Sequence, residues 1–193
     1  FLGTVLNSDG WQIWPYRALF VEVLGVDPLD ERTSLVALTD LAQSRIGSVP
    51  DGLDRDAFLG LLMSHCIEPG IGDWGVVFVT DFPPSQVAMA RYTSVGAADV
   101  AARFERSVHG KELANGYWEQ IDADALAAQL HAENTRRQQR GLPERPIDER
   151  LLAAHLHGLP ECAGVALGVD RLLALKLGAD NLVETISFGW DSA

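Results

Sequence analysis

The first third of the chain places apolar residues at helical spacing. After a first segment without a clean period, residues 1–15, apolar positions recur every three or four residues, and glycine or proline ends each run. Asp30 and Asp54 stand where a side-chain oxygen would cap the next helix. Three helices are therefore predicted: from Tyr16 to about Gly25, from Asp30 to Gly47, and from Asp54 to Pro69.

Beyond residue 75 the pattern becomes that of strands. Val76–Val79 is a β-branched run that enters a loop with two consecutive prolines, which cannot continue a ladder. Two further runs, 103–108 and 111–120, flank His109 and Gly110, and glycine tolerates the positive φ of a tight reversal. The pattern predicts a strand and then a β-hairpin.

The last third alternates helices with one more strand. Asp122 to Arg140 is the longest amphipathic segment, Ile147–His157 is a second, and Gly164–Val169 is an apolar run that passes into a helix at 170–177. Helices first, and then strands with helices between them, indicate an α+β fold. We expect one domain over 1–193, mainly helical over 1–70 and with the sheet and hairpin over 71–193.

Composition narrows the function classes. The 193 residues are 47% hydrophobic and 22% charged, as in a globular protein, and the formal charge of −12 argues against a bulk nucleic-acid binder. Neither a signal-peptide core nor a membrane-length apolar run is present, so we expect a cytoplasmic protein, and the opening at Phe1 rather than Met indicates part of a longer chain. Cys66 and Cys162 are interpreted as small packing residues because they lack metal-ligand spacing. The arginines at 136–150 alternate with carboxylates and are interpreted as a solvated helix face.

A dense polar group surrounds the predicted hairpin. Its members are Glu105, Glu112, Asn115 and Glu119. Neighbouring carboxylates repel unless a cation neutralises them, and Mg²⁺ takes oxygen ligands while bridging to phosphates. A Mg²⁺ site with a cationic substrate is one interpretation, and a solvated strand face is the other. In a regular strand Glu112 would face away from Asn115, so the first interpretation requires a bulge, expected near Gly116.

Two further segments are candidates for ligand contacts. Arg171 stands where the apolar strand after Gly164 enters a helix, and its planar donor fork suits phosphate oxygens, although a surface ion pair is equally compatible. The turn at 81–86, DFPPSQ, would present Ser85 and Gln86 to a ligand or serve only as a turn.

These segments resemble the class II lysyl-tRNA synthetases. RFERSVHGKELANGYWEQ (103–120) is similar to the family segment that faces the amino acid and the metal, and GVALGVDRLLAL (164–175) is similar to motif 3. The resemblance implies the class II antiparallel sheet flanked by helices, ATP and Mg²⁺ as cofactors, and a homodimer in the full-length protein. Motifs 1 and 2 would lie upstream of Phe1, so we expect an incomplete fold and an inactive fragment.

The resemblance also implies roles for individual residues. Glu105 and Glu112 would hold Mg²⁺ against the ATP phosphates, Arg171 would bind the γ-phosphate as the catalytic arginine, Asn115 would contact the substrate carboxylate region, and Glu119 would pair with the ε-ammonium. Ala166 and Gly168 would line the substrate pocket.

Other segments resemble one branch of this family. They are VDPLDERTSL, IEPGIG, FVTDFPPSQVAMAR and RGLPERPID, which are similar to the short paralogue that attaches lysine or β-lysine to elongation factor P. Ala166 stands where lysyl-tRNA synthetases usually have glycine, and its methyl fits a preference for β-lysine. The alternatives are the C-terminal half of a lysyl-tRNA synthetase that acts on tRNA, and a non-catalytic binding module of the same fold.

Overall fold

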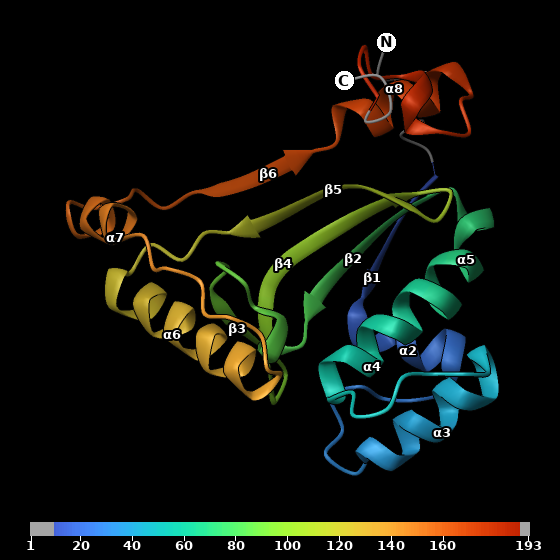
Figure 1. Cartoon of the computed structure of the whole chain (residues 1–193), viewed down its shortest axis with the longest axis horizontal. Coiled ribbons are helices and arrows are strands. Elements are labelled where there is room, and N and C mark those ends of the chain that lie inside the picture. The colour runs from blue at the N-terminus through green and yellow to red at the C-terminus, as the bar shows by residue number, and fades with distance from the viewer. Residues whose placement is uncertain (1–9, 190–193) are drawn as a thin grey trace.

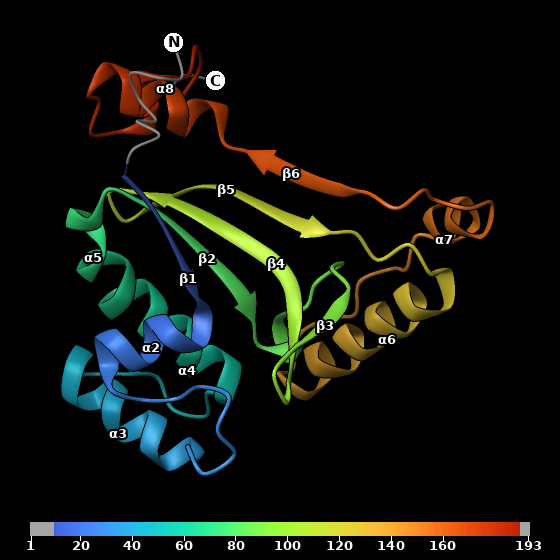
Figure 2. The ribbon, with the colours of Figure 1, turned by 180° about the vertical axis from the view of Figure 1, so that it is seen from behind.

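A mixed sheet forms the centre of the molecule, with the N-terminal helices packed on one face and the helix at 169–177 packed against the other (Figures 1 and 2). The computed structural model describes residues 10–189. Five strands follow the order β1-β2-β4-β5-β6, and β3 pairs with β4 beside this path. All pairs are antiparallel except β1 with β2, which is parallel, so the predicted α+β class is confirmed with one parallel edge.

The parallel edge strand lies in the segment where the sequence shows no period. β1 spans Trp11–Pro15 and pairs with β2, Val76–Phe82. Five residues that end in proline carry little strand signal of their own, and the partner lies some sixty residues away along the chain. Residues 1–9, and with them the predicted opening of the chain within a longer protein, lie outside the described residues.

The three predicted helices are present, with one cap in a different place. α2 spans Tyr16–Leu24 and ends at Gly25, α3 spans Leu35–Ile46, and α4 spans Arg55–Leu62 after the predicted cap Asp54. Asp30 is not the cap of α3: its carboxylate accepts from the Arg32 backbone N–H, and Ser34 caps the helix through the Ala37 N–H at 3.1 Å. The short polar side chain that caps a helix must precede its first turn directly, and only Ser34 does so.

The third predicted helical segment continues beyond α4 as far as Gly70. After α4, a π-helical turn at Met63–Ile67 leads into the one-turn helix α5, Glu68–Gly70, which contains Pro69. A short 3₁₀ turn, Gly72–Trp74, then connects to β2. Helices α2 to α4, the π-helical turn and the inner strands enclose the main apolar core, whose largest fully buried side chains are Tyr16, Phe20, Leu19, Leu38, Leu59, Leu62 and Ile67.

The predicted hairpin is confirmed. β4 spans Ala98–Val108 and β5 spans Lys111–Trp118, and the turn between them has φ of 50° at His109 and 74° at Gly110. A Cβ on Gly110 would lie 2.5 Å from the Glu68 carbonyl oxygen, so glycine allows the tip of the hairpin to pack against α5. β2 is longer than predicted and reaches Phe82, and β3 spans Tyr92–Val95.

The predicted bulge exists, but it lies at Leu113 and not near Gly116. Ser107 pairs with Glu112 and Arg106 pairs with Ala114, so Leu113 is the extra residue on β5. Gly116 stays in the regular ladder opposite Phe104, and a Cβ there would come within 2.5 Å of the Phe104 ring. The bulge therefore reverses the facing of Glu112 relative to the rest of β5.

The C-terminal elements follow the predicted order. α6 spans Ala123–Gln139 with Asp122 as its cap, α7 spans Glu149–Leu156, β6 spans Ala163–Leu167, and α8 spans Val169–Leu177. On α6, Arg136 pairs with Glu133, and Arg140 following it pairs with Asp54, as expected for a solvated helix face. Both cysteines are partly buried, and Cys66 packs against the main core. A short 3₁₀ turn, Leu182–Glu184, follows α8.

Candidate functional site

The strand register collects the candidate residues on one face of the sheet. Glu105 pairs directly with Asn115, and Asn115 pairs with Ala166 on the next strand, so these three side chains share a face. The bulge at Leu113 adds Glu112 to the same face, opposite Ser107. Three strands thus contribute to one polar surface, at the edge of the face that α2 to α5 cover.

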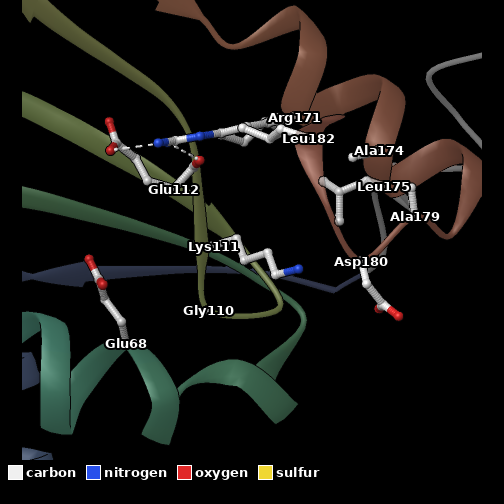
Figure 3. Close-up of a pocket in the computed structure, with 11 residues that line it drawn as sticks. Glu68, Gly110, Lys111, Glu112, Arg171, Ala174, Leu175, Ala179, Asp180 and Leu182 are labelled. Carbon is white, nitrogen blue, oxygen red and sulfur yellow. Dashed lines mark hydrogen bonds and ion pairs between the residues drawn. The ribbon is translucent and has the colours of Figure 1, made fainter. Parts of the chain in front are cut away.

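Glu112 lies at the centre of a hydrogen-bonded group. Its Oε1 accepts from Asn115 Nδ2 at 3.0 Å, and its Oε2 lies 3.3 Å from Arg171 Nη1. The same Nη1 donates to the Glu112 carbonyl oxygen at 2.7 Å, and Figure 3 shows Arg171 reaching from α8 to this residue. The hairpin segment 103–120 and the Asp-Arg helix start are therefore in direct contact.

Gly168 lies between β6 and α8, beside the bulge of β5. Its N–H donates to the Leu113 carbonyl oxygen at 2.9 Å, which ties the start of α8 to β5. A Cβ on Gly168 would lie 3.4 Å from both that oxygen and Arg171 Cδ. These are ordinary van der Waals distances, so the geometry does not require glycine at this position.

Glu105 is a largely buried carboxylate with one cationic partner. Arg103 Nη2 donates to its Oε1. Burial raises the pKa of Glu105 above its ordinary value, Arg103 counteracts this, and the nearby carboxylates of Glu112 and Glu68 raise it further. The site therefore concentrates negative charge that a cation would stabilise.

Glu68 is a site residue that the sequence interpretation missed. It comes from α5, and it lines a cavity of about 450 Å³ together with Lys111, Glu112 and Arg171. Burial and the charge of Glu112 raise the pKa of Glu68. In Figure 3 its carboxylate points toward the Glu112 side of the cavity. Glu68 lies in the segment IEPGIG, but no local signal pointed to a place in the site, because the residues beside it in the cavity are more than forty positions away in sequence.

Glu119 lies just beyond the end of β5, away from this cavity. Its backbone forms a bridge with Ala90, its N–H donates to the Cys162 carbonyl oxygen at 3.1 Å, and its carbonyl oxygen accepts from Arg91 Nε at 2.8 Å. Its carboxylate packs against Gly164: a Cβ there would come within 2.5 Å of Glu119 Oε1. Gly164 therefore makes room for the carboxylate beside β6.

The donor set fits a phosphate-bound Mg²⁺ rather than a metal held by protein alone. Mg²⁺ is usually bound through one or two carboxylates, with the remaining positions taken by water and substrate phosphates. Glu105 and Glu112 supply two carboxylates on one face. Within residues 10–189, no group of three or more His, Cys, Asp or Glu side chains is arranged as a protein-only metal site.

The turn at 81–86 packs against the helices. The Ser85 hydroxyl donates to Asp56 Oδ1 of α4 at 2.7 Å. Because this hydroxyl is bonded within the fold, a structural role for Ser85 is favoured over ligand binding. A hydrogen bond joins Gln86 to the buried Tyr16, whose pKa is raised by burial.

The chain is similar to a known protein family and to several named proteins. The pattern of the family "tRNA synthetases class II (D, K and N)" matches residues 9–192. Three similar proteins are each named "Elongation factor P--(R)-beta-lysine ligase": from Edwardsiella ictaluri at 42% identity, Pectobacterium carotovorum at 41% and Vibrio cholerae at 42%.

The similarity covers the whole of this chain and part of each relative. Each match includes 100% of the chain, which spans 59% of the relative's length. Among the described helices, none has the length and apolar character needed to cross a membrane. The matched family pattern, together with the strand register that gathers its charged residues, shows that this chain belongs to the class II tRNA synthetase family of the D, K and N type.

Proposed function

We propose that the protein containing this chain activates a lysine-type amino acid with ATP and transfers it to a lysine of elongation factor P. The observation that carries the proposal is the arrangement of Glu105, Glu112, Asn115 and Arg171 around one sheet face, with Glu112 bonded to both Asn115 and Arg171. The names of the relatives support the acceptor and the substrate class.

Each residue of the site has a role in this proposal. Glu105 and Glu112 hold Mg²⁺, which neutralises phosphate charge when bound, and Arg171 binds the γ-phosphate. Asn115 contacts the carboxylate region of the amino acid, and Glu119 pairs with its ε-ammonium. Ala166 and Gly168 line the amino-acid pocket of the longer protein, which is distinct from the cavity at Glu68, and the position of Ala166 beside Asn115 supports the assignment of Ala166.

The reaction has two steps. An oxygen of the amino-acid carboxylate attacks the α-phosphorus of ATP, the bond to the bridging oxygen breaks, and pyrophosphate leaves. The acceptor amine then attacks the carbonyl carbon of the adenylate, loses a proton, and AMP leaves. Positioning and charge stabilisation carry both steps, so the enzyme needs no covalent nucleophile.

A complete site requires more than residues 1–193. No segment of this sequence resembles the motif 2 arginine that stabilises charge at the α-phosphate, and the relatives are longer. Removing one such donor costs roughly 10²–10³ in rate. The cytoplasmic location and the homodimer of the longer protein remain predictions.

The proposal is tested by pyrophosphate exchange with Mg²⁺-ATP and either β-lysine or α-lysine. A protein extended to the length of the relatives is expected to be active, and residues 1–193 alone are expected to form no measurable adenylate. Transfer of the activated amino acid is then measured with elongation factor P and with tRNA as competing acceptors. Exchange by the short chain within about tenfold of the longer protein would place the α-phosphate contact inside residues 1–193.

Ala166→Gly is expected to raise the activation of α-lysine relative to β-lysine. The Ala166 methyl shares a face with Asn115, and exclusion by one methyl is typically worth about 1–3 kcal/mol. The measurement is the ratio of the two exchange rates in the longer protein. Ala163→Gly, on the opposite face of β6, is the control and leaves the ratio unchanged. An unchanged ratio for Ala166→Gly would make this residue a packing residue only.

A further inference from the structure

One arginine joins the turn after β2 to the candidate site. Arg103 donates from Nη1 to the Gln86 carbonyl oxygen at 3.0 Å and from Nη2 to Oε1 of Glu105. The carbon at the centre of its guanidinium lies 4.3 Å from the centre of the Phe82 ring and 5.7 Å from that of Tyr117. Its side chain is 14% exposed. Both Nη atoms of the guanidinium are therefore hydrogen-bonded, and two aromatic rings lie close to it.

We propose that Arg103 is a positioning residue that sets the orientation of the Glu105 carboxylate, and that the turn at 81–87 holds Arg103 in place. The proposal rests on the function above for the identity of the cation that Glu105 binds.

A second irregularity in the sheet builds this contact. Thr80 pairs with Phe104, but Phe82 pairs with Ala101, so β4 has an extra residue between these two pairs. Without it, Phe82 would pair with Ala102 and would lie on the opposite face from Arg103. The intervening Asp81 has φ of 54°. The irregularity thus transfers the Phe82 ring to the face where Arg103 lies.

The contact also leaves one oxygen of Glu105 available. Arg103 engages Oε1, and Oε2 has no hydrogen-bond partner among residues 10–189. The nearby carboxylates of Glu68 and Glu112 repel Glu105, so an unrestrained side chain would turn away from them. A planar guanidinium stacked on aromatic rings restrains it better than a flexible ammonium would.

Stability alone does not account for this arginine. Within the described part of the chain, the Nε of Arg103 is buried without a hydrogen-bond partner, which is unfavourable. Buried ion pairs also contribute little net stability, because desolvation offsets their attraction. We therefore expect Arg103 to contribute by orienting the Glu105 carboxylate rather than by stabilising the fold.

The test is ATP binding by calorimetry at a series of Mg²⁺ concentrations, with the longer protein and its Arg103→Met and Arg103→Lys variants. Groups that orient a metal ligand typically change metal affinity by about 10–100-fold, so Arg103→Met is expected to raise the Mg²⁺ requirement by at least about tenfold. Arg103→Lys keeps a positive charge beside the rings, so its Mg²⁺ requirement should lie between those of the wild type and Arg103→Met. If Arg103→Met does not fold, Arg103→Lys alone tests the proposal.

A double-mutant cycle with Glu105→Gln identifies the route of the effect. If Arg103 acts through Glu105, Arg103→Met has little further effect on the Mg²⁺ requirement once Glu105 is glutamine. Arg55→Lys is the matched control, because among residues 10–189 the Arg55 side chain bonds only to backbone carbonyl oxygens of Pro28, Asp30 and Thr33. It should lower the melting temperature without changing the Mg²⁺ requirement.

Two outcomes overturn the proposal: an unchanged Mg²⁺ requirement in both Arg103 variants, or equal effects of Arg103→Met with and without Glu105. Either can occur while the longer protein still catalyses lysine-dependent exchange, in which case the proposed function stands. If the wild-type protein shows no such exchange, the proposed function fails, and nucleotide binding still decides the role of Arg103.

Discussion

Replacing Glu119 by glutamine in the longer protein is expected to reduce lysine-dependent pyrophosphate exchange by roughly a thousandfold. An ammonium in a closed pocket needs a charge partner, and removal of one partner of a buried pair costs about 3–5 kcal/mol. Glu119 is suited to this role because Gly164 leaves space for its carboxylate, and because its backbone is tied to Ala90, Cys162 and Arg91. The measurement is exchange with β-lysine at saturating ATP, together with ATP affinity.

ATP binding should survive this change, because Glu119 lies away from the cavity that contains Glu112 and Arg171. Glu133→Gln is the matched control: the same change of charge on α6, where Glu133 forms an ion pair with Arg136, should leave exchange unchanged. Exchange near the wild-type rate in Glu119→Gln would remove Glu119 from the amino-acid pocket.

Arg171→Lys is expected to lower the exchange rate by about 10²–10³ while the protein stays folded. A lysine keeps the charge but cannot reproduce the planar donor fork of arginine. Loss of one preorganised donor to the developing phosphate charge typically lowers the rate by about 10²–10³. The side chain of Arg171 is 48% exposed and, within the described part of the chain, bonds only to Glu112, so it contributes little to folding stability.

The experiment compares exchange and melting temperature for Arg171→Lys with those for Arg32→Lys. Arg32 is an exposed arginine whose side chain pairs with Asp30, far from the site, so its variant should match the wild type in exchange. A loss in Arg171→Lys that is accompanied by a large fall in melting temperature would instead make Arg171 a structural anchor between α8 and Glu112.

Local signals in the sequence determined most of the secondary structure. Asp54 and Asp122 cap the helices that follow them, and Gly25 ends α2, because each acts on its own turn of backbone. The hairpin around His109 and Gly110 was likewise readable, since a positive φ at the turn is a local requirement. The predicted cap Asp30 was wrong. Asp30 and Ser34 both precede α3, and only Ser34 lies next to its first turn, so Ser34 is the cap.

The facing of the site residues was decided only by the tertiary structure. The Mg²⁺ interpretation of the sequence required a bulge, which was expected near Gly116. Its actual position at Leu113 depends on the pairing of β5 with β4, where Gly116 stays opposite Phe104. One residue of register reverses every side chain, so composition cannot locate such a shift. β1, Glu68 and the contact of Arg103 with Gln86 share this cause. Each depends on segments far apart in the chain that only the assembled sheet brings together.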